Sequence, residues 1–307
     1  MFSRAEALDK GLTSNQLRTA NYHRVSRGIW QAPGADFSDS DARAQLIRLL
    51  PALADELPHH ALSHQSAALL WGMRLPPRLQ VPGPVHVTRM GEGQRVKRTG
   101  FLGHRAANSL MVRRHSSGIA VTGPARTLID IAGLLSEIEL ICVVDGVICS
   151  HLTGVNRDRP PQRSFEDLHR DLDLLRGSRG VEKVRRAMER ACVGSDSAPE
   201  TRLRLELEDA GARSFETDLE IRGAGGFPVN PDLGDPRARL SVQYEGQHHD
   251  ERGQRGRDIR RLRATEEAGW TEVRIFGADL DMQVSRGGRR MSRAVALVLD
   301  ALEAKGF

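Results

Sequence analysis

Within the first 35 residues, short apolar segments are separated by turns, and the expected elements follow the order found in a small winged helix. Ser3 can cap a first helix, and Thr13 or Ser14 can cap a second helix over SNQLRTA. The segment HRVSRGIWQAP alternates around Arg27 and predicts two short strands joined by a tight turn. Helix, turn, helix and hairpin together predict a winged-helix-like DNA-binding unit.

In a winged helix the second helix enters the major groove of DNA and the hairpin contacts the backbone or the minor groove. The side chains expected at base edges are Asn15, Gln16 and Arg18, and those expected at phosphates are Arg24 and Arg27. The alternative is a small packing domain whose basic face is only solvated.

The middle of the chain predicts a mixed α/β domain over residues 36–150. Residues 39–72 have a helical pattern, and Pro51 predicts a break or kink within it. PVHVTR and MVRRH alternate as strands do, and two helices are expected near 123–133 and 136–149. Between 85 and 115 there are seven basic residues and one acidic residue. Either these charges belong to a sheet edge that faces DNA, or they only prevent an exposed edge strand from pairing with another chain.

Four segments of this first half resemble AbiEi-family proteins, the antitoxins of type IV toxin–antitoxin systems. They are the winged unit, SHQSAALLWGM at 63–73, VHVTR at 85–89 and VTGPARTLIDIAG at 121–133, of which the last is the most specific. The resemblance implies a DNA-binding transcriptional autoregulator, and it makes a cognate toxin protein a candidate partner.

The second half begins with a polar stretch and then changes pattern. Residues 151–196 predict a linker, HLTGVNRDRPPQRS, followed by two helices near 165–175 and 180–192. From Ser197 the order becomes helix, three strands, helix, strand, helix, which predicts an α/β domain with a mixed sheet over 197–307. The expected strands are 215–221, 227–233, 239–245 and 271–276. One helix is expected to start near Pro199, and two further helices are expected over 254–268 and 287–304.

Two carboxylates in this domain come at the ends of successive strands. Asp232 ends one strand and Glu245 the next, and Gln243, Glu245 and Gln247 are spaced to share one sheet face. Paired carboxylates suit a hard cation such as Mg²⁺, which could activate water against a phosphodiester. The simpler interpretation is a pair of solvated acids at strand ends.

Residues 197–280 resemble the Vsr-like branch of the PD-(D/E)XK nucleases. The resemblance rests on the strand ending in YEGQHH, on the Asp258-x-x-Arg261 helix and on the Gly269-Trp270 entry to a strand. It implies a restriction-endonuclease-like fold, Mg²⁺-dependent cleavage of DNA, and a set of site residues. The first-helix acid corresponds to Glu200, the metal-binding Asp to Asp232, the acid of the second half-motif to Gln243, the next same-face acid to Glu245, and the histidine to His249.

This sequence departs from that pattern at one ligand position, because Gln243 is neutral. Either the site has lost an acid and the domain binds DNA or a partner without cutting, or the motif is shifted by two residues along the strand. In the second case Glu245 is the metal ligand beside Asp232, and Gln247 replaces the usual lysine. Residues 197–280 contain no lysine, so Gln247, His249 or an arginine would have to take that role.

Composition adds to this picture through the placement of its arginines. The chain has 307 residues, 39% of them apolar, and a net charge of +5, and 41 of its 45 basic residues are arginines. Codon bias accounts for such a ratio, but the charge gathers at 85–115 and around 252–263, where Arg255 and Arg257 are candidate phosphate contacts. Cys142, Cys149 and Cys192 lack CxxC spacing, and no apolar run predicts a membrane span or a secretion signal, so a cytoplasmic protein is expected.

The leading hypothesis is a DNA-binding protein with a Vsr-like nuclease-fold domain, active with Mg²⁺ or degenerate. In an active site Asp232 and Glu245 would hold the ion, Glu200 would support it, and Gln247 or His249 would orient water. The main alternative is a non-catalytic AbiEi-like antitoxin and transcriptional regulator. A third interpretation is a module that binds a partner protein and no DNA.

Overall fold

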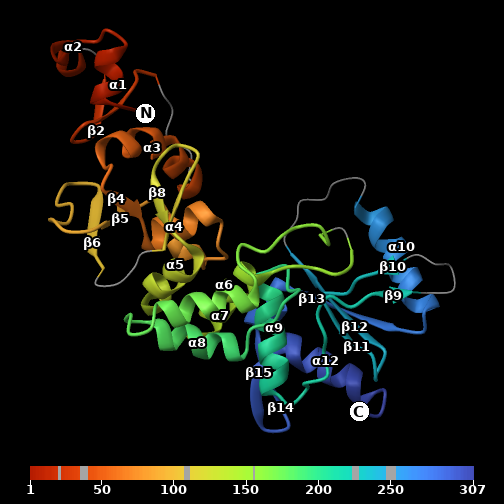
Figure 1. Cartoon of the computed structure of the whole chain (residues 1–307). Helices are drawn as coiled ribbons and strands as arrows, with labels where there is room; N and C mark the ends of the chain where they lie inside the picture. The colour runs from red at the N-terminus through yellow and green to blue at the C-terminus, as the bar shows by residue number, and fades with distance from the viewer. Residues whose placement is uncertain (20–21, 35–40, 107–110, 155, 223–227, 247–253) are drawn as a thin grey trace. The chain divides into compact units, whose positions relative to one another are not determined.

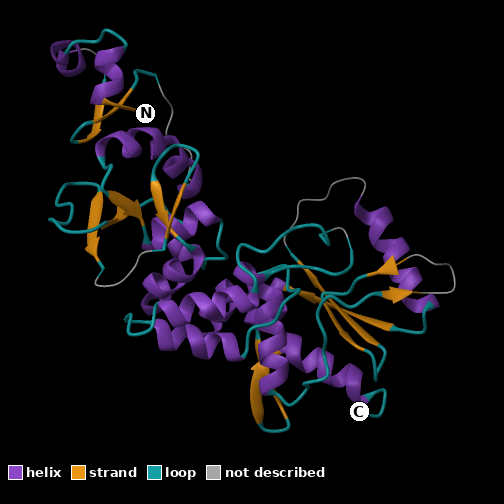
Figure 2. Cartoon of the chain, viewed as in Figure 1, coloured by secondary structure: helices purple, strands orange, loops and turns teal. Residues whose placement is uncertain are grey.

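The chain is a mixed α+β protein with several small sheets (Figures 1 and 2). It divides into two compact units, which we call unit 1 (1–136 and 166–186) and unit 2 (137–165 and 187–307). The computed structural model describes residues 1–19, 22–34, 41–106, 111–154, 156–222, 228–246 and 254–307.

Unit 1 opens with the predicted helices and hairpin. Helices α1 (Arg4–Asp9) and α2 (Ser14–Thr19) precede strands β2 (His23–Ser26) and β3 (Ile29–Gln31). The Oγ of Ser3 accepts a hydrogen bond from the Glu6 N–H, as expected of an N-cap, and donates to Asp55 Oδ2 at 2.7 Å. A short strand not predicted, β1 (Phe2–Ser3), pairs with β3 and completes a three-stranded sheet.

Of the break or kink predicted at Pro51, the break is wrong. Helix α3 (Ala42–Glu56) runs through this residue. Proline removes one backbone hydrogen bond, but Leu46, Leu50 and Leu53 bury one side of α3 in the core of unit 1, and this burial offsets the loss.

A five-stranded mixed sheet forms the rest of this core. Its order is β6-β5-β4-β8-β7, and the strand β5 over VHVTR is as predicted. Helix α4 (His64–Trp71) packs against α5 (Pro124–Ile131) and next to β5. The strand bounds are β4 (His60–Leu62), β5 (Val85–Arg89), β6 (Phe101–Arg105), β7 (Val112–Arg114) and β8 (Ala120–Thr122).

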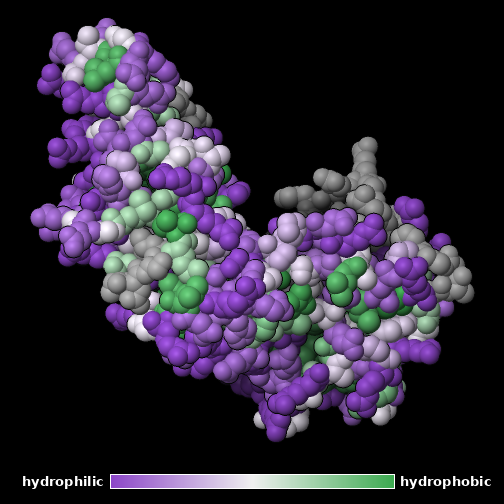
Figure 3. All heavy atoms as spheres, in the orientation of Figure 1, coloured by the Kyte–Doolittle hydropathy of each residue, from purple (hydrophilic) through white to green (hydrophobic). Residues whose placement is uncertain are grey.

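Two predicted helices complete unit 1. These are α7 (Phe165–Leu174) and α8 (Val181–Glu189). Lys183 on α8 donates its Nζ to the Ala132 carbonyl at 2.8 Å, so the helix is tied to the end of α5. Hydrophilic residues dominate the view over α7 and α8 (Figure 3).

Unit 2 contains the predicted mixed sheet, in the order β11-β12-β13. Strand β12 (Leu240–Glu245) is antiparallel to β11 (Leu233–Asp235) and parallel to β13 (Thr271–Phe276), with α10 (Gln254–Glu267) as the crossover. Apolar residues of α9 (Ala198–Asp209) and α12 (Arg293–Glu303) pack on one face of this sheet (Figure 1). A smaller cluster joins α10 to β9 (Ile221–Arg222) and β10 (Pro228–Val229).

The sequence prediction for unit 2 is wrong at two places. The strand expected over 215–221 is reduced to β9 and an isolated bridge between Glu216 and Gly234. The helix expected from 287 starts only at Arg293, because β14 (Gln283–Arg286) and β15 (Arg289–Ser292) form a hairpin after the short helix α11 (Gly277–Asp281). The turn of this hairpin is Gly287-Gly288, and both glycines have positive φ.

A buried ion pair joins α9 to α6 (Glu137–Ile148). The Asp145 side chain on α6 is fully buried and accepts hydrogen bonds from Arg204 Nη2 at 3.1 Å and Thr201 Oγ1 at 2.8 Å. The Cys192 N–H also donates to it at 2.8 Å. Since α9 carries Glu200 in its first turn, this pair fixes the helix that positions a candidate site residue.

In the described part of the chain, no helix is long and apolar enough to span a bilayer.

Candidate functional site

Polar side chains gather on the face of the unit 2 sheet that α10 covers. In the parallel register Ser241 pairs with Glu272 and Gln243 with Arg274, and Glu245 lies two residues beyond Gln243 on the same face. Arg261 of α10 reaches this face and donates to Glu245 Oε1 at 3.1 Å. The opposite face carries the apolar core, so this face is the chemical side of the sheet.

Asp232 lies directly before β11 and is adjacent to Gln243. Its Oδ1 accepts from Gln243 Nε2 at 2.7 Å, and its Oδ2 accepts from the Tyr244 N–H at 2.6 Å. The antiparallel register, in which Leu233 pairs with Val242, explains this arrangement. The residue hydrogen-bonded to Asp232 through its side chain is therefore Gln243.

Glu245 belongs to a different part of the same face. It pairs with Arg261, which also lies 3.7 Å from the buried Glu272 carboxylate. Arg274 pairs with the other oxygen of Glu272 at 2.7 Å. The side chain of Asp258 lies outside the described part of the structure, and within that part the acidic partners of Arg261 are Glu245 and Glu272.

Several buried polar atoms on this face have no hydrogen-bond partner among the described residues. They are Ser241 Oγ, Gln243 Oε1, Glu272 Oε2 and Arg261 Nε. The donation of Gln243 Nε2 to Asp232 fixes the orientation of the amide, so its carbonyl oxygen is the atom left unpaired. Arg261 Nε and Glu272 Oε2 still form an ion pair at 3.7 Å, whereas Ser241 Oγ and Gln243 Oε1 are costly to bury unless a water molecule or an ion meets them.

Electrostatics sets Asp232 apart from an ordinary strand-end acid. Burial and the nearby Glu200 carboxylate raise the pKa of Asp232 to about 7. Hydrogen bonds from Tyr244 and Gln243 and the charge of Arg261 act in the opposite direction. Glu200 is itself buried, and its Oε2 accepts from the Asp196 N–H at 2.7 Å. Two carboxylates that destabilise each other's charge are a suitable environment for a cation.

The other predicted site residues have different outcomes. Gln247 and His249 lie outside the described residues, and Arg255 and Arg257 lie in the first half of α10 without a description of their side chains. The winged-unit candidates are all exposed, with three on α2 and two on or next to the hairpin: Asn15, Gln16, Arg18, Arg24 and Arg27.

Sequence reasoning missed Glu272 and the role of Arg261 at Glu245. The signal was present in TEVRIF, where Glu272 and Arg274 alternate with apolar residues at strand spacing. A charged residue at every second position of a strand between two helices indicates a polar sheet face.

No protein-family model matches this chain, and no solved structure matches it. It is similar to the uncharacterized protein Rv2248 of Mycobacterium tuberculosis strain H37Rv, with 25% identity over 281 residues. The uncharacterized protein MT2308 of strain CDC 1551 has the same identity, and in both cases the alignment covers 91% of this chain and 94% of the relative. The similarity therefore extends through both units.

Proposed function

We propose that this chain is a DNA-binding protein whose unit 2 has a Vsr-like nuclease fold and holds Mg²⁺ at Asp232. The observation that carries the proposal is the buried arrangement of Asp232, Glu200 and Gln243, with a carboxyl pKa raised to about 7. The order of helix, strands, crossover helix and parallel strand supports the same assignment.

The residues present fit a magnesium ion. Asp232, Glu200 and the unpaired carbonyl oxygen of Gln243 are hard oxygen donors, which Mg²⁺ prefers. When bound, Mg²⁺ supplies neutralisation of charge on a phosphodiester and lowers the pKa of coordinated water. Arg261 supplies the fixed positive charge that a lysine would otherwise provide near Asp232. Glu245 and Glu272 hold this guanidinium in place.

The exposed α2 and hairpin of unit 1 would dock DNA. Ser26 Oγ donates to the Thr99 carbonyl and Arg98 donates to the Arg27 carbonyl, so the hairpin is anchored to the basic segment that follows β5. The Arg27 side chain is exposed, and an anchored hairpin reduces the backbone part of the ordering cost on binding.

A second candidate function is favoured by Gln243 itself. An amide is a weaker Mg²⁺ ligand than a carboxylate, so the same fold could bind DNA without cutting it, as an AbiEi-like regulator would. The two functions separate cleanly in a cleavage assay.

We expect purified protein with Mg²⁺ or Mn²⁺ to nick supercoiled plasmid DNA, and we expect Asp232→Ala to reduce the rate at least about 100-fold. Glu267→Gln, an exposed carboxylate on α10, is the matched control and should cleave at the wild-type rate. Cleavage that persists in Asp232→Ala would refute the site. Specific DNA binding with no cleavage in either metal would identify the non-catalytic regulator.

Single substitutions on the winged unit should separate base from phosphate contacts. Arg18→Ala is expected to weaken binding by about 1–3 kcal/mol and to relax sequence preference, because its guanidinium is expected at a base edge. Arg27→Ala should weaken binding equally on all sequences and reduce the salt slope by about 1. Gel shifts at several salt concentrations measure both effects. Arg290→Ala, an exposed arginine of β15, is the control, and an equal loss from all three variants would contradict this docking mode.

A further inference from the structure

Three imidazoles from separate elements converge in unit 1. His64 begins α4, His86 is on β5 and His104 is on β6, and one nitrogen of each lies within 4.8 Å of the others. His86 Nδ1 and His104 Nε2 are 3.1 Å apart. Two nitrogens bound to one tetrahedral Zn²⁺ at about 2.0–2.1 Å would lie about 3.3 Å apart, so the observed separation fits a shared ion.

The arrangement leaves the required nitrogens available. His64 Nδ1 is 3.0 Å from Ser63 Oγ and 3.7 Å from Asp130 Oδ2, so its Nε2 is the atom left for an ion. Arg126 holds the Asp130 carboxylate by an ion pair at 2.8 Å. A carboxylate behind a ligating imidazole is the usual orienting partner in zinc sites.

The backbone supports the same role. His64 has a φ of 49°, a left-handed conformation that is unfavourable for a residue other than glycine and that recurs at functional sites. The rings of His64 and His104 stack with centroids 3.7 Å apart, so one ring must turn before a nitrogen of each can meet the same ion.

We propose that His64, His86 and His104 form a three-histidine site for Zn²⁺ whose open coordination position takes a phosphate group. Three protein ligands with one open position are typical of zinc sites that act on a ligand, whereas structural zinc sites have four protein ligands.

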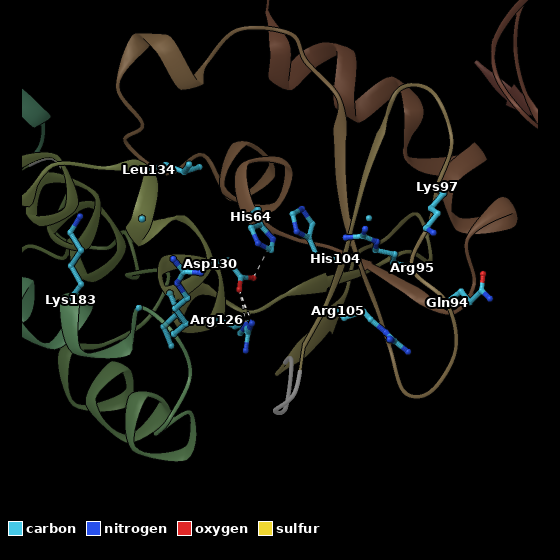
Figure 4. A pocket seen from close by; sticks show the side chains of 15 residues that line it. His64, Gln94, Arg95, Lys97, His104, Arg105, Arg126, Asp130, Leu134 and Lys183 are labelled. Atoms are coloured by element: carbon cyan, nitrogen blue, oxygen red, sulfur yellow. Dashed lines mark hydrogen bonds and ion pairs between the residues drawn. The ribbon is translucent and has the colours of Figure 1, made fainter.

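The surroundings specify the anion. His64 and His104 line a cleft of about 1090 Å³, and Figure 4 shows them side by side with Asp130 next to His64. The one acid of this lining, Asp130, is already paired with Arg126, whereas several lining cations are exposed. Cationic side chains around a metal with an open position favour an oxyanion over a neutral ligand. The cationic lining residues are Arg95, Lys97, Arg105, Arg126, Arg179 and Lys183.

Zinc binding is tested by calorimetry on tag-free full-length protein stripped of metal. Wild type should bind Zn²⁺ at this site, and His104→Gln should weaken that binding by more than about 100-fold. Unit 2 offers a competing set of potential ligands in Cys149, His151 and Asp196. Cys149→Ser is therefore measured in parallel and should leave the same binding event unchanged. His23→Gln, which alters an exposed histidine of β2, is the matched control.

Cobalt provides a readout that needs no variant. Co²⁺ added to wild type should give the intense visible absorption of a four-coordinate site with nitrogen ligands, without a thiolate charge-transfer band. Absence of tight Zn²⁺ binding, its loss in Cys149→Ser, or a thiolate band would each overturn the three-histidine site.

The anion is tested with inorganic phosphate as the probe. Phosphate should tighten Zn²⁺ binding to wild type, and Arg105→Gln should abolish this coupling while it leaves Zn²⁺ affinity in chloride unchanged. Zinc binding that phosphate does not affect would overturn the phosphate assignment and retain the metal site.

Discussion

Replacing Arg204 with methionine should lower the free energy of unfolding of unit 2 by about 3–5 kcal/mol. The Asp145 side chain is fully buried, and Arg204 is its charge partner at 3.1 Å. Burial raises the pKa of Asp145 while Arg204 lowers it, so loss of the guanidinium leaves an uncompensated buried acid. The variant should therefore lose more stability at pH 8 than at pH 5, which urea unfolding at the two pH values measures.

The matched experiment removes both charges. Asp145→Leu combined with Arg204→Met should recover most of the loss, because two apolar side chains do not leave a buried charge. The recovery should not be complete, because the Cys192 N–H loses its Asp145 acceptor and Thr201 Oγ1 keeps only its contact with Ser195. A double variant as unstable as the single one would mean that Arg204 acts through its other partners, Glu208 and the Arg190 carbonyl.

Asp232→Asn is expected to stabilise the metal-free protein at pH 8 by up to about 4 kcal/mol and to have little effect at pH 4. The pKa of Asp232 is raised to about 7 in the fold, whereas an unfolded aspartate titrates near 4. Wild-type stability therefore falls as pH rises from about 4 to about 7, and above that range the full penalty is present. Asparagine is uncharged, like the protonated aspartic acid. Gln243 can rotate its side-chain amide so that its carbonyl oxygen accepts a hydrogen bond from the asparagine NH2 group.

Magnesium should reverse the relative stability of wild type and Asp232→Asn at pH 8. With excess Mg²⁺ at pH 8, wild type should gain more stability than Asp232→Asn, because a charged carboxylate binds the ion more strongly than a neutral amide does. Unfolding midpoints in EDTA and in Mg²⁺ give both comparisons. Glu200→Gln is the control for electrostatic origin, since it removes the neighbouring charge and should give part of the same stabilisation without metal. A wild type that is more stable at pH 8 than at pH 5 in EDTA would contradict the raised pKa.

Much of the fold follows from local sequence rules. Ser3 and Ser197 cap helices because their hydroxyls accept from N–H groups three residues ahead, a relationship contained within one turn. Pro51 misleads because the burial of α3 against distant residues outweighs a local preference. The short strands β4 and β8 are fully buried and have no alternation, so periodicity does not reveal them.

The candidate sites depend on contacts that spacing does not encode. Asp232 and Gln243 could be paired in advance because a hairpin brings neighbouring strand ends together. Arg261 reaches Glu245 and Glu272 only through the crossover geometry of α10. The histidines of the three-histidine site are 22 and 18 residues apart, which matches no metal-ligand spacing. The parallel pairing of β5 with β6 brings His86 near His104, and the packing of α4 next to β5 adds His64.

The interleaved division of the chain has a consequence for synthesis on the ribosome. Unit 1 consists of 1–136 and 166–186, and the intervening residues belong to unit 2. Domains usually fold in the order in which they emerge, each as a closed unit. Here the N-terminal unit must wait for α7 and α8, while the first segment of unit 2, including the buried Asp145, has already emerged without its arginine partner. Nascent chains released shortly after residue 165 should therefore be the species most exposed to chaperones and proteases.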